Sequence, residues 1–136
     1  MKPFRLATLT LGFLGSLGAL FQFWFLAAYF VYPPPSGYQP NYQVYPIDIV
    51  VLSWDLGVSL SGFSGTVISF FKPRIGGVVL LIAGTAGLLP WVVFTFLNSG
   101  VVTFTLYDAA TLSWIALLLI AGLLGIIRNS HAKILS

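Results

Sequence analysis

The stretch IDIVVLSWDLGVSLSGFSGTVISFFKPRIGGVVLLIAGTAGLLPWVVFTFL, residues 47–97, contains two long apolar runs joined by the tripeptide KPR at 72–74. A helix needs roughly 20 mostly apolar residues to cross a hydrocarbon core about 30 Å thick. The runs at 47–71 and 75–97 both reach that length. Because the connection between them is so short, the stretch predicts two antiparallel transmembrane helices that are neighbours.

Composition extends this prediction to the whole chain. Of its 136 residues, 58% are hydrophobic and only 7% are charged, and the mean hydropathy is +0.99, which excludes an ordinary soluble domain. The predicted fold class is therefore an all-α integral membrane protein, a four-transmembrane-helix bundle built from two antiparallel hairpins. We expect one membrane domain, 1–136, with spans at 6–31, 47–71, 75–97 and 104–127, outer loops at 32–46 and 98–103, and a tail at 128–136.

The basic residues predict the orientation of these spans. All six lie before the first span, between the second and third, or after the fourth: Lys2, Arg5, Lys72, Arg74, Arg128 and Lys133. The other two connections contain no Lys or Arg. Cytoplasmic loops hold the Lys/Arg excess in membrane proteins, so we expect both termini in the cytoplasm and the chain in the cell membrane. The net charge of +3 is expected to contact anionic lipid headgroups, and no basic cluster is dense enough to indicate nucleic acid.

Few residues of the chain could support catalysis or hold a cofactor. The chain has no cysteine, its single histidine, His131, lies in the predicted tail, and its single methionine is Met1. Haem in a membrane bundle needs axial ligands at membrane depth, and the His, Met and Cys ligands are excluded. We also find no Ser/His/Asp set, pair of carboxylates at membrane depth or phosphate-binding glycine loop. The sequence therefore predicts a protein that is not an enzyme and carries no cofactor or metal.

A weak internal repeat relates the two halves of the chain. The second and fourth spans share D-x3-L-S-W-x7-G-x2-G, beginning at Asp48 and Asp108. The first and third share R-x9-G-x2-G, beginning at Arg5 and Arg74. A parallel repeat of this kind implies a pseudo-twofold axis along the membrane normal. Chance similarity in a sequence of low diversity is the alternative, and the sequence does not decide between them.

Small residues recur at helix-packing spacing. In a bilayer, helices associate through close contact of small residues and through polar bonds, because lipid tails are as apolar as leucine. The second span carries a row of small residues at every fourth position: Ser53, Gly57, Ser61, Gly65 and Ser69. On the other three spans the candidate packing residues are the glycines Gly12, Gly87 and Gly125. We therefore expect the second span to be the central helix, with neighbours on two sides. Pro90 inside the third span predicts a bend, either a simple kink or the broken helix of a binding site.

Asp55 is the residue least suited to a membrane span. It follows the boundary at Pro46 by nine residues, or about 13 Å along a helix. An acid near the centre of a span costs about 2.5–3.5 kcal/mol on insertion scales, and is by default a candidate functional site. We expect it to be protonated or paired with another chain, since the basic residues lie at the opposite rim. With Ser59 and Gln22 it forms the candidate intramembrane polar or partner site.

Three interpretations of Asp55 remain open. In the first, it is a neutral, structural group bonded to Ser59 or to a backbone carbonyl. In the second, it contacts a partner subunit. In the third, it is a proton- or cation-binding site. The first two favour a non-catalytic accessory subunit of a larger membrane complex, such as a respiratory one, with other membrane subunits and the lipid bilayer as partners. The third favours a small oligomeric transporter or channel. The segment RIGG at 74–77, followed by LLIAG, resembles many uncharacterised prokaryotic four-span proteins, and this resemblance implies no activity.

Overall fold

The computed structural model describes residues 3–31, 46–97 and 106–135. These residues form four helices and no strand: α1 Pro3–Val31, α2 Pro46–Phe71, α3 Pro73–Leu97 and α4 Leu106–Leu135. Each helix contains a segment long and apolar enough to cross a membrane: Pro3–Ala28, Ile49–Phe71, Pro73–Val93 and Ala109–Ile127. The described chain is thus all-helical, as a multi-pass membrane protein with four spans would be.

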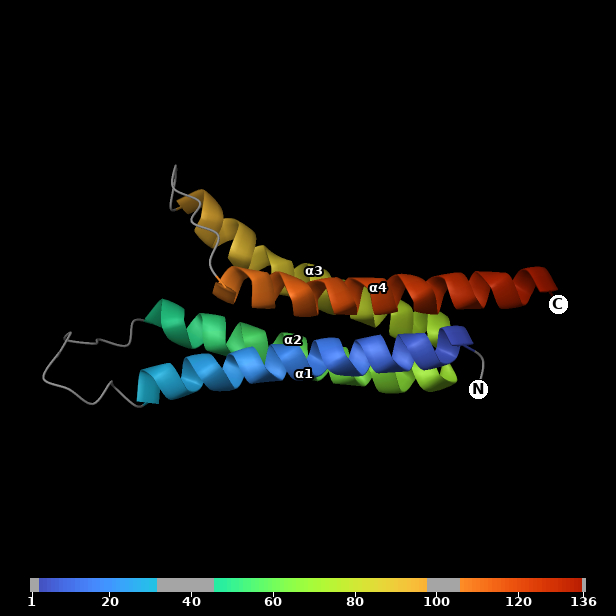
Figure 1. Cartoon of the computed structure of the whole chain (residues 1–136), viewed down its shortest axis with the longest axis horizontal. Helices are drawn as coiled ribbons and strands as arrows, with labels where there is room; N and C mark the ends of the chain where they lie inside the picture. The colour runs from blue at the N-terminus through green and yellow to red at the C-terminus, as the bar shows by residue number, and fades with distance from the viewer. Residues whose placement is uncertain (1–2, 32–45, 98–105, 136) are drawn as a thin grey trace, which may run out of the picture.

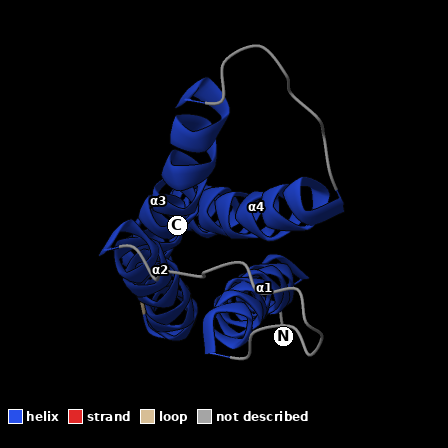
Figure 2. Cartoon of the chain, turned by 90° about the vertical axis from the view of Figure 1, so that its left-hand side faces the viewer, coloured by secondary structure: helices blue, strands red, loops and turns tan. Residues whose placement is uncertain are grey.

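The four helices form a bundle in which consecutive helices run in opposite directions (Figure 1). α1 packs against α2 and α4, and α3 packs against the same two helices. Seen from one end, the helices therefore occupy the corners of a ring (Figure 2). α2 does have neighbours on two sides, but so does every other helix. The expectation that the second span is central is wrong, because each of the four helices packs mainly against two others.

Lys72 is the single described residue that joins α2 to α3. The Lys72 amide donates to the Ile68 carbonyl at 2.7 Å, and the Gly76 amide donates to the Lys72 carbonyl at 2.9 Å. Both bonds have helical i to i−4 spacing, so Lys72 closes the last turn of α2 and opens the first turn of α3. Pro73 begins α3, where its missing amide hydrogen costs nothing. A Cβ on Gly76 would collide with the backbone of Ser69, so only glycine allows so sharp a reversal. We call this end of the bundle the Lys72 end.

The end of α4 departs from the expected range, whereas α3 is bent as Pro90 predicts. α4 continues to Leu135, so residues 128–135, expected as a tail, are helical beyond the candidate span that ends at Ile127. α3 contains Pro90, and its last turns diverge from the rest of the bundle in Figure 1. Proline removes one helical hydrogen bond and crowds the preceding turn, which is the ordinary cause of such a bend.

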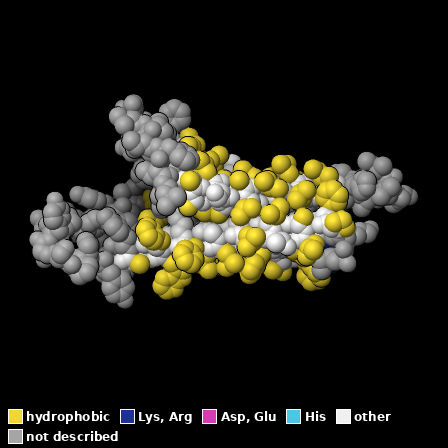
Figure 3. Space-filling model, viewed as in Figure 1, with side chains coloured by type: hydrophobic (Ala, Val, Ile, Leu, Met, Phe, Trp, Pro, Cys, Tyr) yellow, Lys and Arg dark blue, Asp and Glu magenta, His cyan; other side chains and the backbone are white. Residues whose placement is uncertain are grey.

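The interior of the bundle is small and partly polar. Its apolar core consists of Ala19, Val58, Leu80, Ala83, Trp114, Ile115, Leu118 and Ala121. Among the residues whose burial the structure describes, seven polar side chains are buried with it: Thr8, Ser16, Asp55, Ser59, Thr66, Ser69 and Thr111. Large apolar side chains face outward instead, and they cover the side seen in Figure 3. Small and hydroxyl-bearing residues thus share the interior with a few bulky apolar ones, and packing in lipid favours such small residues where helices meet.

Candidate functional site

The carboxamide of Gln22 links three helices at one point in the bundle. From α1, its Oε1 accepts a hydrogen bond from Trp114 Nε1 at 2.7 Å and another from Thr111 Oγ1 at 3.0 Å, both on α4. Its Nε2 donates to Asp55 Oδ2 on α2 at 3.4 Å. Thr111 and Trp114 lie three positions apart and therefore share one face of α4. We call these four residues the Gln22 network.

The donor and acceptor roles in this network are determined by chemistry. The indole N–H of Trp114 can only donate, so the Gln22 atom that faces it must be the amide oxygen. Both lone pairs of that oxygen are then used, by Trp114 and Thr111. The amide nitrogen must consequently lie toward Asp55, whose carboxyl oxygen is a good acceptor.

Three members of the network are almost completely enclosed. Asp55 is 3% exposed, Thr111 3% and Trp114 4%, whereas Gln22 is half-buried. Gln22 lies six positions inside the end of its candidate span at Ala28, which is about 9 Å along the helix. A polar group buried at such a depth without a partner is costly, so the mutual bonding of these side chains stabilises the bundle.

No basic side chain of the described chain approaches Asp55. Lys72 lies 17 positions further along α2, about 25 Å at the helical rise. Arg5 is also at the Lys72 end, where its Nη2 donates to the Phe70 carbonyl at 3.3 Å and its guanidinium carbon lies 4.0 Å from the centre of the Phe70 ring. Among the described residues no three His, Cys, Asp or Glu side chains are grouped closely enough to hold a metal ion.

The structure brings together two of the three residues expected at this site. Gln22 bonds Asp55, but Ser59 does not take part, since its Oγ donates to the Ser16 carbonyl of α1 at 3.2 Å. Thr111 and Trp114 were not among the residues expected at this site. Their i, i+3 spacing was visible, but nothing in it indicated that this face of α4 is turned toward α1.

The row of small residues on α2 falls into two halves with different surroundings. A Cβ on Gly65 would lie 3.0 Å from the side chains of Leu80 and Val79 of α3, and Ser69 is buried against Gly76. A Cβ on Gly57 would meet nothing within 4 Å. The half of the row nearer the Lys72 end therefore packs within the chain.

The other half of the row is exposed: Ser53, Gly57 and Ser61. We call it the α2 face. It borders a groove of about 500 Å³ between α2 and α3, lined also by Ala83 and Ala86. Trp54 crosses this groove, because its Nε1 donates to the Ala86 carbonyl at 2.6 Å.

The glycines expected to pack on the other helices lie at close helix–helix contacts. A Cβ on Gly12 would lie 2.5 Å from Thr66 Oγ1 of α2. One on Gly87 would lie 2.6 Å from the Trp114 ring, and one on Gly125 would lie 2.9 Å from the Pro73 carbonyl oxygen. These positions leave no room for a side chain.

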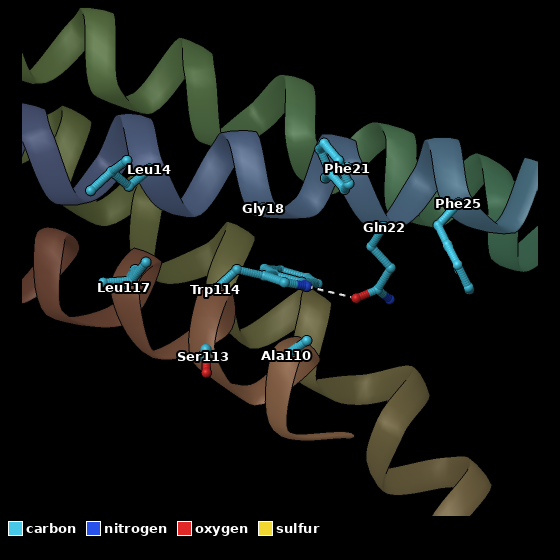
Figure 4. A pocket seen from close by; sticks show the side chains of 9 residues that line it. All are labelled: Leu14, Gly18, Phe21, Gln22, Phe25, Ala110, Ser113, Trp114 and Leu117. Carbon is cyan, nitrogen blue, oxygen red and sulfur yellow. Dashed lines mark hydrogen bonds between the residues drawn. The ribbon is translucent and has the colours of Figure 1, made fainter. Parts of the chain in front are cut away.

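A second groove, of about 620 Å³, lies between α1 and α4 (Figure 4). Its lining is apolar except for the Gln22 carboxamide, the Ser113 hydroxyl and the Trp114 indole N–H. The Gln22 side chain extends from α1 toward α4, where it meets Trp114 (Figure 4). We call this cavity the α1–α4 groove.

The Gln22 network is not duplicated in the two halves of the chain. The repeat would place Ile115 at the position of Asp55 and Trp91 at the position of Gln22, and neither is equivalent. No known protein family matches the chain, and no curated protein or solved structure is significantly similar to it.

Proposed function

We propose that the chain is a non-catalytic accessory subunit of a larger membrane assembly, and that it binds a transmembrane helix of a neighbouring subunit through the α2 face. The observation that carries this proposal is Gly57, a glycine on the outside of the bundle with no atom of its own chain beside it. Ser53 and Ser61 continue the same surface one turn to either side. Lipid contact requires no such row of small residues.

Small residues at every fourth position allow two helix backbones to approach closely, and dispersion and weak polar contacts then hold them together. Elsewhere in the bundle the same residue types serve this purpose, as Gly65 does against α3. The α2 face has the same pattern without a helix of this chain on it. The adjoining α2–α3 groove, with Ala83 and Ala86 in its wall, extends the surface available to a partner helix.

The arrangement of Asp55 supports a structural role for that residue. At 3% exposure it offers little surface to a basic side chain of another subunit, and its partner is Gln22 of the same chain. Its contact joins α2 to α1 at the level where α4 is also bonded. We infer that the network orients the helices that carry the docking surface.

The alternative is a small oligomeric transporter that uses Asp55 as a proton or cation site. In its favour, α1 and α2 carry buried hydroxyls between the Lys72 end and Asp55: Thr8, Ser69, Thr66, Ser16 and Ser59. Each of these hydroxyls, however, donates to a backbone carbonyl, so they do not form a continuous chain of hydrogen bonds. The accessory role is therefore the better supported of the two.

With this function we propose that the chain lies in the cell membrane with the Lys72 end facing the cytoplasm. We also propose that the two hairpins, α1–α2 and α3–α4, arose by duplication of one unit. The described basic side chains Arg5, Lys72 and Arg74 all lie at the Lys72 end. A membrane-impermeant amine reagent added to intact cells should leave Lys72 unmodified and should modify it after the cells are opened. Labelling of Lys72 from outside would reverse the topology.

The docking proposal is tested by Gly57→Leu, with Val67→Leu as the matched control on an exposed part of the same helix. Gently extracted wild-type protein should appear in a heteromeric complex by native mass analysis. Gly57→Leu should abolish the complex without lowering the thermal stability of the isolated chain, since the new side chain meets open space. Val67→Leu should leave the complex intact. A Gly57→Leu chain that still assembles, or a wild-type chain found alone or only with copies of itself, would contradict the proposal.

The transporter alternative is tested separately by Asp55→Asn, which keeps an oxygen to accept the Gln22 bond. If the accessory role is correct, the variant should assemble as the wild type does. If Asp55 binds a transported ion, wild-type chain in liposomes should show pH- or cation-coupled flux, and the variant should lose it.

A further inference from the structure

The Gln22 carboxamide retains one unused donor. An amide nitrogen carries two hydrogens, and one of them is donated to Asp55. No described residue accepts the second, whereas both lone pairs of the amide oxygen are occupied. Gln22 also lines the α1–α4 groove, so this N–H is available to a molecule inside it.

No other lining side chain offers a free donor. The Ser113 hydroxyl donates to the Ala109 carbonyl of its own helix at 2.7 Å, and the Trp114 indole donates to Gln22. An occupant of the groove would therefore meet a single N–H in apolar surroundings. That arrangement selects a ligand with a hydrogen-bond acceptor and little else that is polar.

The walls of the groove are aromatic on both sides of Gln22. Phe21 and Phe25 line it from α1, and the almost completely enclosed Trp114 lies on α4 with its indole directed at Gln22 (Figure 4). Phe21 and Phe25 are both exposed on the outside of the bundle, so the groove opens sideways toward lipid. Flat rings favour stacking against another flat ring, and a volume of about 620 Å³ is within the usual range for a small-molecule site.

We propose that the α1–α4 groove binds a lipid-soluble quinone, with the ring against the Phe21 and Phe25 side chains and one carbonyl oxygen accepting the free N–H of Gln22. The hydrocarbon tail of the quinone would leave the groove sideways into the bilayer. This proposal does not depend on the docking function, because the α2 face lies on α2 and the groove between α1 and α4, on the other side of the ring (Figure 2).

Depth distinguishes a quinone from a phospholipid as the occupant. Gln22 lies about 9 Å inside the end of its candidate span, whereas the ester carbonyls of a phospholipid remain at the interface. An acyl chain alone could fill the groove, but it would leave the N–H without an acceptor, and such a group is costly in an apolar site. A quinone carries its carbonyl groups into the hydrocarbon layer, so it can both reach the depth of Gln22 and accept the N–H.

The test uses purified full-length chain in detergent and decylubiquinone as the probe, with quenching of tryptophan fluorescence as the readout. Ala110→Leu fills the groove from α4 without touching the Gln22 network, because Ala110 is an exposed lining residue. Ala116→Leu is the matched control, an exposed alanine of the same helix outside the lining. Decylbenzene, which has a ring and the same tail but no acceptor, is the competing ligand. If Ala110→Leu fails to fold, Ser113→Leu replaces it.

We expect saturable quenching by the quinone, about tenfold or more weaker binding in Ala110→Leu and unchanged binding in Ala116→Leu. Decylbenzene should compete about tenfold or more weakly than the quinone. Quenching that does not saturate, or that is equal in both variants, would place the probe in the micelle rather than in the groove. Equal competition by decylbenzene would make the groove a general hydrocarbon site. Any of these three results overturns the proposal.

Discussion

Replacing Gln22 by leucine removes three hydrogen bonds with one substitution. Leucine has nearly the volume of glutamine but no polar atom, so it leaves the Trp114 indole, the Thr111 hydroxyl and the Asp55 carboxyl without this partner. Hydrogen bonds between membrane helices average about 0.6 kcal/mol and reach about 1.7 kcal/mol. The bonds of 2.7 and 3.0 Å are well within ordinary limits and carry most of the effect, while the bond of 3.4 Å to Asp55 is long. We expect the free energy of unfolding to fall by about 2–3 kcal/mol.

The measurement is reversible unfolding in mixed micelles by increasing amounts of a denaturing detergent, followed by circular dichroism. Thr85→Val is the control, because the Thr85 hydroxyl is exposed and donates only to the Leu81 carbonyl of its own helix. It should change the free energy of unfolding by less than about 0.5 kcal/mol.

A double-mutant cycle with Asp55→Leu tests whether the network acts as a unit. In the wild type, Asp55→Leu removes a bonded carboxyl and orphans one Gln22 hydrogen, so it should be neutral or destabilising. In the Gln22→Leu background the same change removes a buried carboxyl that has lost this partner, so it should stabilise the chain. Strict additivity of the two substitutions, or a Gln22→Leu chain as stable as the wild type, would refute the idea that this network holds the three helices together.

Four further substitutions probe other positions, each by the same unfolding measurement. Gly76→Ala should lower the free energy of unfolding by about 1–3 kcal/mol, because the new Cβ collides with the α2 backbone at the turn. Gly57→Ala should change it by less than about 0.5 kcal/mol, because its Cβ meets open space. Equal effects of the two substitutions would contradict the difference in packing around these glycines. Arg5→Gln should cost about 0.5–1 kcal/mol by removing the guanidinium from the Phe70 ring, and an unchanged stability would mean that this exposed contact contributes nothing. Ser59→Ala should cost about 0.6 kcal/mol through the lost bond to an α1 carbonyl, and a loss several times larger would indicate a further role for this hydroxyl.

The helices themselves were predictable from the sequence because each is encoded locally. A run of about 20 apolar residues can meet a bilayer in few other ways, since backbone polar groups in lipid must bond within the segment. The turn at Lys72 follows from the short tripeptide between two such runs, and the bend of α3 from Pro90. Orientation and the internal repeat were also proposed from the sequence, and they remain predictions.

The partners of Asp55 were less predictable, because they depend on how the helices are rotated about their own axes. Gln22 and Ser59 were both singled out as polar residues within a span, and sequence spacing does not show which of them bonds Asp55. Only the packed bundle shows that Ser59 bonds the α1 backbone while the Gln22 amide connects Asp55 to α4.

The pattern of apolar residues thus determined that this chain is helical and suited to a membrane, because burial of backbone polar groups in lipid requires it. Which small residues contact another helix was decided by the tertiary structure alone. The row on α2 is continuous in sequence, yet α3 covers Gly65 and leaves Gly57 open. The rotation and bending of a neighbouring helix are set by close packing over its whole length, and no single segment contains that information.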